Sequence, residues 1–165
     1  MTAALFSRGK GRRAAAAVGA VTLGLVALTA CDKPTPLATV TVGSTSKTTE
    51  ATKGCYTDGK ALEEKKWRAC LNREGARTLT VHSGEKVRVG VDPEIAESGW
   101  TLVAGGRVVV DDTKATYRSF DSDLLFVRQD ETGQLIPLKE VTLTVVEAGE
   151  SGPKGLWHFN LKQES

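Results

Sequence analysis

Residues from which metal centres and nucleic-acid interfaces are built are scarce in this sequence. The 165 residues include two His and three Cys, which leaves little material for a histidine-rich metal site. The formal net charge is +2, but the first 30 residues hold four basic side chains and no acidic one, so the rest of the chain is mildly acidic. A chain without a basic stripe is a poor candidate for binding nucleic acid. At this length we expect one folded domain, and a multidomain enzyme is excluded.

The longest apolar run is too short for a secure transmembrane helix. Residues 14–28 contain only Ala, Val, Gly, Leu and a single Thr, whereas a span needs roughly 20 strongly apolar residues. The run follows a short basic segment, residues 1–13, and this order is typical of a secretory signal peptide. We therefore predict a signal-peptide helix within residues 1–30. The adjacent Arg12 and Arg13 leave twin-arginine export open as an alternative to the general secretory route.

Leu-Thr-Ala-Cys at residues 28–31 closes the apolar run and resembles the lipobox of bacterial lipoproteins. In a lipobox the bond before the Cys is cut, and the Cys thiol takes a diacylglyceryl group. The resemblance implies cleavage between Ala30 and Cys31 and acylation of Cys31. It also implies an exported protein that is lipid-anchored to the outer face of the cytoplasmic membrane. Residues 31–36 are polar with two prolines, and we interpret them as a tether between the anchor and the domain.

Cys55 and Cys70 remain as an even pair once Cys31 is acylated. In an exported domain, an even pair predicts one disulfide bond. Free thiols and a metal site are the alternatives. The absence of a Cys-x-x-Cys spacing and of a nearby His disfavours metal binding.

The segment between these two cysteines is a candidate recognition element. Good helix formers at residues 60–69 predict a short helix, with Asp58 as its cap. We interpret Lys65, Lys66 and Trp67 as candidate contacts for a protein partner, because an excursion held on a rigid scaffold often carries recognition. For Trp67 we favour packing of the segment onto the domain, with the partner contact as the alternative.

Most of the mature sequence alternates between apolar and polar residues, which is the period of β-strands. We expect a hairpin through the Ser83-Gly84 turn, a polar loop over residues 43–54 and a single helical turn at residues 94–98. Eight or nine short strands with Gly- and Asp-rich turns predict an all-β, antiparallel sandwich over residues 37–165. The predicted strands are 37–42, 78–82, 86–91, 100–104, 107–111, 115–120, 123–128, 140–146 and 156–162.

The features after the lipobox also resemble a known family. A Thr-rich first strand and a Cys pair precede the sequence Val-Arg-Val-Gly-Val-Asp-Pro-Glu-Ile-Ala at residues 87–96, and Gly99-Trp100 then leads into a Gly-Gly turn. This arrangement is similar to the actinobacterial lipoproteins that are grouped as a domain of unknown function, over most of the mature chain. The resemblance implies an immunoglobulin-like fold and a surface lipoprotein, and it implies no activity.

The two histidines do not form part of a recognisable catalytic set. His82 and His158 stand in the polar phase of predicted strands, so we expect both to be exposed on the sheet surface. No Gly-x-Ser-x-Gly motif and no free Cys stands beside them to complete a nucleophile–base pair. We therefore expect no catalytic residue and no enzymatic activity.

Acidic residues gather in predicted turns, where calcium ligands of sandwich proteins also occur. They lack the Asp-x-Asp-x-Asp-Gly order of a calcium loop, and Asp is also a common turn former. We favour the turn-forming role and expect no metal ion and no other cofactor, with calcium as the alternative. These residues are Asp111, Asp112, Asp121, Asp123, Asp130 and Glu131.

These expectations favour a membrane-anchored lipoprotein of the cell envelope that acts as a non-catalytic binding or structural module. We expect a monomer whose partners are the lipid bilayer, through acylated Cys31, and a protein of the envelope. Two alternatives stay open, an accessory or sensor subunit of a membrane complex and a small secreted hydrolase. Sandwich folds host all three classes, so the fold does not decide among them.

Overall fold

The computed structural model describes residues 34–164. The predicted signal peptide, its cleavage site at Ala30 and the acylation site at Cys31 lie outside these residues, as do residues 31–33 of the predicted tether. Within the described part of the chain, no helix is both long enough and apolar enough to span a bilayer.

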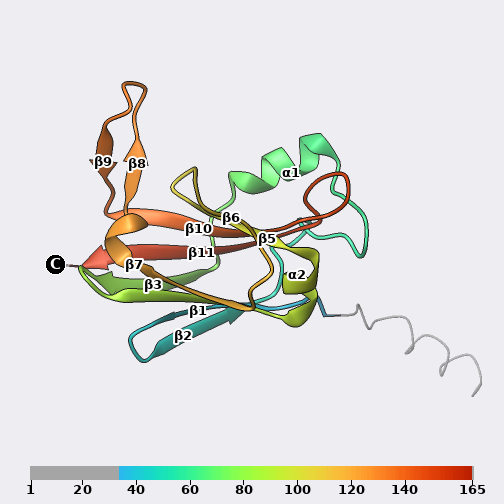
Figure 1. Cartoon of the computed structure of the whole chain (residues 1–165), viewed down its shortest axis with the longest axis horizontal. Helices are drawn as coiled ribbons and strands as arrows, with labels where there is room; N and C mark the ends of the chain where they lie inside the picture. Colours follow the sequence, from blue (N-terminus) through green and yellow to red (C-terminus); the bar gives the residue numbers. More distant parts are fainter. Residues whose placement is uncertain (1–33, 165) are drawn as a thin grey trace, which may run out of the picture. The chain divides into compact units, whose positions relative to one another are not determined.

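Nine strands of the described chain form two sheets, with strand orders β2-β1-β4-β7 and β3-β11-β10-β5-β6 (Figure 1). The first sheet contains β1 (Ala38–Val42), β2 (Thr45–Thr49), β4 (Lys86–Val91) and β7 (Tyr117–Asp121). The second contains β3 (Arg77–His82), β5 (Trp100–Ala104), β6 (Arg107–Thr113), β10 (Glu140–Glu147) and β11 (Gly155–Glu164). A separate ribbon and three short helices complete the fold: β8 (Val127–Gln129), β9 (Leu135–Pro137), α1 (Glu64–Leu71), α2 (Pro93–Ser98) and the 3-10 helix η1 (Ser122–Leu124).

The strand order is that of an immunoglobulin-like domain. The pair β4-β7 corresponds to strands B and E, and the run β11-β10-β5-β6 corresponds to strands G, F, C and C′. All pairings in the two sheets are antiparallel except that of β3 with β11, which is parallel. Trp100 is fully buried on β5, the counterpart of strand C, where immunoglobulin domains carry a buried Trp. The predicted all-β, immunoglobulin-like sandwich is confirmed.

The core lies between the two sheets, because each strand turns its apolar phase inward. Two indole rings at the centre are fully buried, and both have a partner for their N–H group. Trp100 Nε1 donates to the carbonyl of Ala115 at 2.8 Å, and Trp157 Nε1 donates to the carbonyl of Pro36 at 2.8 Å. Burying each large side chain contributes on the order of 2–3 kcal/mol or more. The other large, fully buried core residues include Phe159, Leu79, Ile95, Leu102, Leu125, Leu143 and Leu161.

The hairpin predicted at Ser83-Gly84 is wrong. β3 lies in the second sheet beside β11, whereas β4 lies in the first sheet beside β1, so this turn carries the chain from one sheet to the other. Both strands bury their Val and Leu side chains in the shared core. Alternation therefore fits either arrangement, and pairing partners that are distant in sequence decide between them.

Two further segments differ from their predictions. Residues 43–54, expected as a loop, contain β2, whose side chains are mostly exposed and which is held by its pairing with β1. Residues 123–128, expected as one strand, are divided between η1 and β8. Leu125 and Phe126 are both buried, and two adjacent buried side chains do not fit the alternation of a strand with one exposed face. β8 and β9 then form a hairpin that projects from the sandwich (Figure 1).

Candidate partner-binding site

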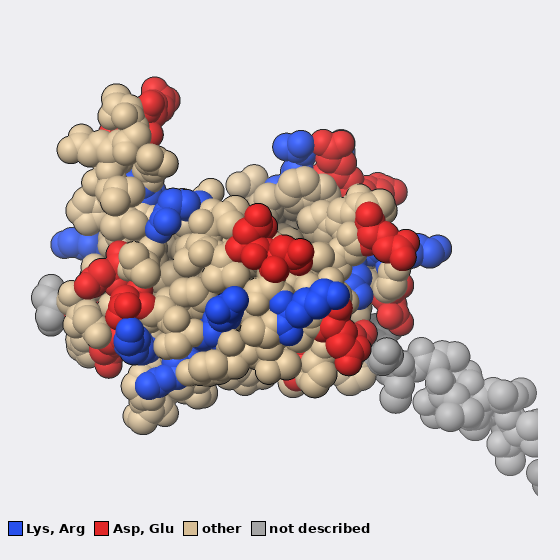
Figure 2. All heavy atoms as spheres, in the orientation of Figure 1, with Lys and Arg blue, Asp and Glu red and all other residues tan. Residues whose placement is uncertain are grey.

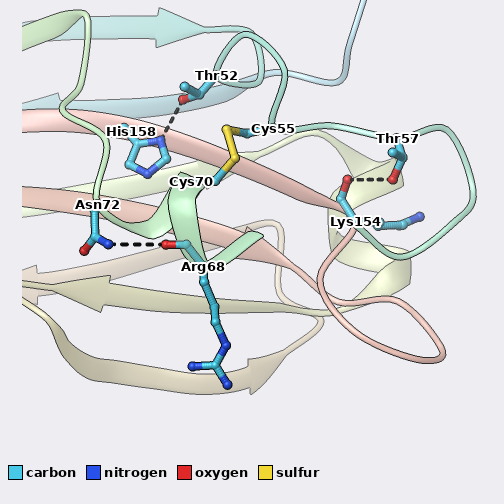
Figure 3. Close-up of a disulfide and its surroundings, with 8 residues drawn as sticks. All are labelled: Thr52, Cys55, Thr57, Arg68, Cys70, Asn72, Lys154 and His158. Atoms are coloured by element: carbon cyan, nitrogen blue, oxygen red, sulfur yellow. Dashed lines mark hydrogen bonds between the residues drawn. A yellow bond between two sulfur atoms is a disulfide. The ribbon is translucent and has the colours of Figure 1, made fainter. Parts of the chain in front are cut away.

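The predicted disulfide is confirmed, and it holds the segment that carries the candidate partner contacts (Figure 3). The Sγ atoms of Cys55 and Cys70 are bonded, and their Cα atoms lie 5.9 Å apart. Both residues are buried, with 0% and 2% of their surface exposed. We call residues 50–76 the bridged segment. It leaves the first sheet after β2 and rejoins the sandwich at β3.

The first arm of the bridged segment pairs with the beginning of β11. Thr52 N–H donates to the carbonyl of Leu156 at 2.8 Å, and Leu156 N–H donates to the carbonyl of Cys55 at 2.9 Å. Tyr56 makes an antiparallel bridge to Gly155. The arm therefore has the backbone hydrogen bonds of a short added strand, which fixes its position against the second sheet.

A second apolar cluster lies under the bridged segment, on the face of the second sheet that points away from the core. Its buried members are Leu62, Leu156 and the two bridged cysteines. Trp67 and Leu71 of α1 pack on the same cluster, together with Val146 of β10. The segment is thus docked by its own hydrophobic contacts as well as by the covalent bond.

The second arm of the bridged segment is fixed by a side-chain amide. Asn160 on β11 accepts the N–H of Gly75 at 2.9 Å through Oδ1 and donates to its carbonyl at 2.9 Å through Nδ2. A Cβ atom on Gly75 would lie 2.6 Å from the Cα atom of Phe159, so only glycine allows this close approach to the backbone of β11.

His158 is buried, and the prediction that it is exposed on the sheet surface is wrong. Only 2% of the residue is exposed, because the bridged segment covers it. Its Nδ1 shares a hydrogen bond of 2.6 Å with the Thr52 hydroxyl, and its Nε2 has no hydrogen-bond partner among the described residues. Figure 3 shows the ring beside the disulfide. Burial lowers the pKa of His158 to about 4, although the Cys70 carbonyl opposes the shift, so the ring is neutral at pH 7.

His82 is exposed, as predicted. It lies at the end of β3, whereas His158 lies on β11 under the bridged segment. The two histidines therefore have different environments, one in solvent and one buried under the bridged segment.

The exposed surface of α1 presents the predicted partner contacts. Lys65 and Lys66 are exposed, whereas Trp67 is partly buried in the second cluster. The Arg68 guanidinium lies 5.3 Å from the centre of the Trp67 ring and pairs with Glu64 at 2.8 Å. The packing interpretation of Trp67 is therefore supported, and its role as a partner contact stays a prediction. α1 begins at Glu64, four residues later than predicted, because Leu62 is drawn into the cluster and Asp58 does not cap the helix.

A buried ion pair at the end of β10 was not anticipated from the sequence. Glu147 is fully buried, and its Oε1 lies 3.0 Å from the Nζ of Lys154, whose side chain is 16% exposed. Neither Glu147 oxygen accepts a hydrogen bond from the described residues. Burial raises the pKa of Glu147, and the contact with Lys154 partly offsets the rise. Its inward position in the alternation of β10, after Val141, Leu143 and Val145, was the available signal.

Tyr56, on the first arm of the bridged segment, packs against the main core. Its ring meets Trp157 edge to face, with ring centres 6.1 Å apart. Burial raises the pKa of Tyr56 to about 12, and the nearby charges of Glu94 and Glu147 add to the effect. The phenol is therefore un-ionised at physiological pH, and it serves as a packing group between the bridged segment and β11.

Two of the acidic turn residues, Asp130 and Asp121, have polar partners within the described chain. Asp130 Oδ1 accepts the N–H groups of Thr132 and Gln134, each at 2.9 Å, and the Thr132 hydroxyl at 2.7 Å, which makes it the turn former of the β8–β9 hairpin. These bonds, that of the Thr132 hydroxyl first, lower the pKa of Asp130. Asp121 pairs with Lys86 at 2.6 Å. Among residues 34–164, no group of three or more His, Cys, Asp or Glu side chains is placed to hold a metal ion.

An open depression of about 430 Å³ lies on the second sheet, outside the core. The Asn160 amide at its floor is already engaged by Gly75, and Lys162 faces Glu140 at 3.7 Å. Its polar groups are thus largely paired within the chain. The lining residues are Glu74, Thr78, Glu140, Val141, Thr142, Asn160, Leu161 and Lys162.

The described residues therefore assemble two local arrangements, a disulfide-bridged platform that presents α1 and a buried ion pair beside it. Comparison of the chain with protein-family models, with curated proteins and with solved structures finds no match.

Proposed function

We propose that this protein is a lipid-anchored binding module of the cell envelope, and that the exposed face of α1 contacts a protein partner. The anchor is acylated Cys31, by the resemblance of residues 28–31 to a lipobox. The observation that carries the binding role is the construction of the bridged segment. It is tied by a disulfide, by backbone pairing to β11 and by its own apolar cluster, yet it leaves Lys65 and Lys66 exposed.

This construction suits recognition because the platform is already ordered before a partner arrives. Binding usually costs about 0.5–1.5 kcal/mol for each side chain that becomes immobilised, and ordering a loop costs more. Here the backbone of the bridged segment is fixed at both arms, through Leu156 and Asn160. The two lysines lie beside Glu63 and Glu64, so the helix offers charges of both signs to a partner surface.

The anchor is tested with Cys31→Ser. We expect the wild-type protein to incorporate labelled palmitate and to partition into detergent with the membrane fraction. The Cys31→Ser variant should lose the label and either stay uncleaved at Ala30 or leave the membrane. Equal labelling of the two proteins would refute the anchor.

The partner surface is tested by reversing charge on α1 with the disulfide kept. The Lys65→Glu, Lys66→Glu variant should lose a partner that co-purifies with the full-length, detergent-solubilised protein. Lys47→Glu, Lys139→Glu makes the same change of charge on exposed positions of other elements and serves as the control. Unchanged capture by the α1 variant, at an unchanged melting temperature, would leave the bridged segment with a structural role only. A partner present in stoichiometric amount would favour an accessory subunit of a membrane complex over a free-standing module.

A further inference from the structure

The beginning of the described chain is fixed on the domain before β1 starts. The hydroxyl of Thr35 accepts the N–H of Ala51 at 2.8 Å, and the carbonyl of buried Pro36 accepts the indole N–H of Trp157 at 2.8 Å. Residues 34–36, part of the predicted tether, therefore belong to the folded unit, which begins at Pro34. Their position is set by contacts with the bridged segment and with β11.

These contacts leave a very short link between the proposed anchor and the domain. Four Cα–Cα steps separate Cys31 from Thr35 in the sequence. A fully extended chain advances at most about 3.3–3.6 Å per residue, so this link reaches about 14 Å at most. A link of that length cannot lift the attached end of the domain far from the lipid surface.

The attachment point lies at one end of the sandwich. The first residues of the chain bond to Trp157 near the beginning of β11, and Leu37 N–H donates to Asp92, directly before α2, at 2.7 Å. The base of the β8–β9 hairpin lies at the other end of the same strand, where Gln163 N–H donates to the carbonyl of Lys139 at 2.8 Å. Six residues of strand between these points amount to about 20 Å, and Figure 1 shows the hairpin extending from that far end.

We propose that the α2 end of the sandwich rests against the headgroup layer of the membrane, and that the end bearing the β8–β9 hairpin points away from it. The inference rests on the proposed lipid anchor and adds to it the surface that meets the lipid. Exposed Glu94 and Glu97 on α2 belong to the membrane-facing end. Exposed Leu124 and Leu135, at 55% and 60%, belong to the distal end, where they remain accessible.

The link, rather than charge, holds this orientation. The membrane-facing end carries the acids of α2 together with Lys53 and Lys114, and Figure 2 shows basic and acidic side chains interspersed on the visible face. Lipid surfaces that attract proteins by charge do so through clusters of basic residues, and that attraction fades in salt. We therefore expect the orientation to persist at high ionic strength.

The orientation is tested with a fluorophore on a single introduced Cys in the full-length, lipidated protein, in vesicles whose lipid headgroups carry a nitroxide quencher. Glu94→Cys places the label on α2, and Glu131→Cys places it on the exposed turn of the β8–β9 hairpin. Labelling is done without reductant, so that the native disulfide stays intact. Because this disulfide is buried, the label reacts only with the introduced Cys. We expect loss of fluorescence from the label at 94 and retained fluorescence from the label at 131, at low and at high salt.

A matched control lengthens the link. A Gly/Ser insert of about 20 residues between Lys33 and Pro34 adds an average reach of about 25 Å, and it should restore the fluorescence of the label at 94. Equal quenching of both labels or stronger quenching at 131 would overturn the orientation while the anchor stands. Quenching at 94 that survives the insert would overturn the short link as the cause of the orientation. Absence of palmitate from the wild-type protein would instead overturn the anchor, and the orientation with it.

Discussion

Replacing Lys154 by Met should destabilise the domain strongly at neutral pH, because it leaves the Glu147 carboxylate buried without a counter-ion. In the wild-type protein the Nζ of Lys154 lies 3.0 Å from Oε1 of Glu147, which is fully buried. Met has a similar length and keeps the apolar part of the Lys side chain. The backbone of residue 154 keeps its hydrogen bonds to Thr57 and to Glu147, so the substitution removes little besides the charge.

The expected loss is about 3–5 kcal/mol of unfolding free energy, which is the usual cost of breaking a buried ion pair by removing one partner. This is a large part of the roughly 5–15 kcal/mol that stabilises a domain. The cost comes from the orphaned charge and not from lost packing. The double variant Glu147→Leu, Lys154→Met should therefore be close to the wild type or more stable than it.

The loss should shrink as the pH falls. Burial raises the pKa of Glu147 in the folded state above its ordinary value, so the folded state binds the proton more tightly than the unfolded state. A group of this kind contributes most to stability below its unfolded pKa, and the contribution is lost as the pH rises through the folded pKa. Without Lys154, which lowers this pKa, the folded value rises further. The deficit of Lys154→Met relative to the wild type should fall by up to about 1.4 kcal/mol per pH unit on acidification.

Urea denaturation of the wild type, Lys154→Met and the double variant at pH 7 and at pH 5 measures these quantities. We expect a deficit for the single variant that is several kcal/mol at pH 7 and clearly smaller at pH 5, and no such pH dependence for the double variant. A single-variant deficit below about 1 kcal/mol, which is typical of exposed pairs, or one that is the same at both pH values would refute the reasoning.

Three further predictions concern the bridged segment and its support. Cys55→Ala with Cys70→Ala should lower the unfolding free energy by about 3 kcal/mol, the chain-entropy value for a loop of 15 residues, and equal urea midpoints with and without reductant would contradict this. His158 has a folded pKa of about 4, well below its ordinary value. Its contribution to the free energy of unfolding is therefore complete above about pH 6.5 and is lost as the pH falls toward 4. NMR should show its ring titrating near pH 4, and a midpoint near 6.5 would show that it is not buried. Gly75→Ala should cost about 1–3 kcal/mol or more through overpacking against the backbone of β11, whereas Gly90→Ala, which meets nothing closer than 3.8 Å, should cost less. Equal melting temperatures for these two variants would contradict the claim that Gly75 is needed for close approach to β11.

The sequence predicts the disulfide and the exposed lysines of the candidate site, but not the contacts that hold the bridged segment on the domain. The pairing of Cys55 with Cys70 follows from an even number of cysteines in an exported chain, and the exposed lysines follow from a charged segment between strands. The docking of that segment depends on Leu156, Asn160 and His158 of β11, which lie more than 80 residues further along the chain. No local pattern predicts which segment will cover a strand's outer face. For this reason the sequence predicts an exposed His158. The prediction places His158 on the outer face of β11 correctly, but it misses the segment that covers this face.

Local sequence patterns are enough to specify the strongly alternating strands, the class of fold and the disulfide. β1, β4, β5, β10 and β11 have one apolar phase, and burying such a phase is enough to specify a strand and the face that it turns to the core. Three features depend on contacts between distant parts of the chain: the crossing between sheets after β3, the pairing of polar β2 as a strand, and the ion pair of Glu147 with Lys154. Each of these depends on backbone pairing or charge pairing between surfaces brought together by folding. A periodic pattern records which side of a strand is buried, and it carries no information about the neighbour that buries it.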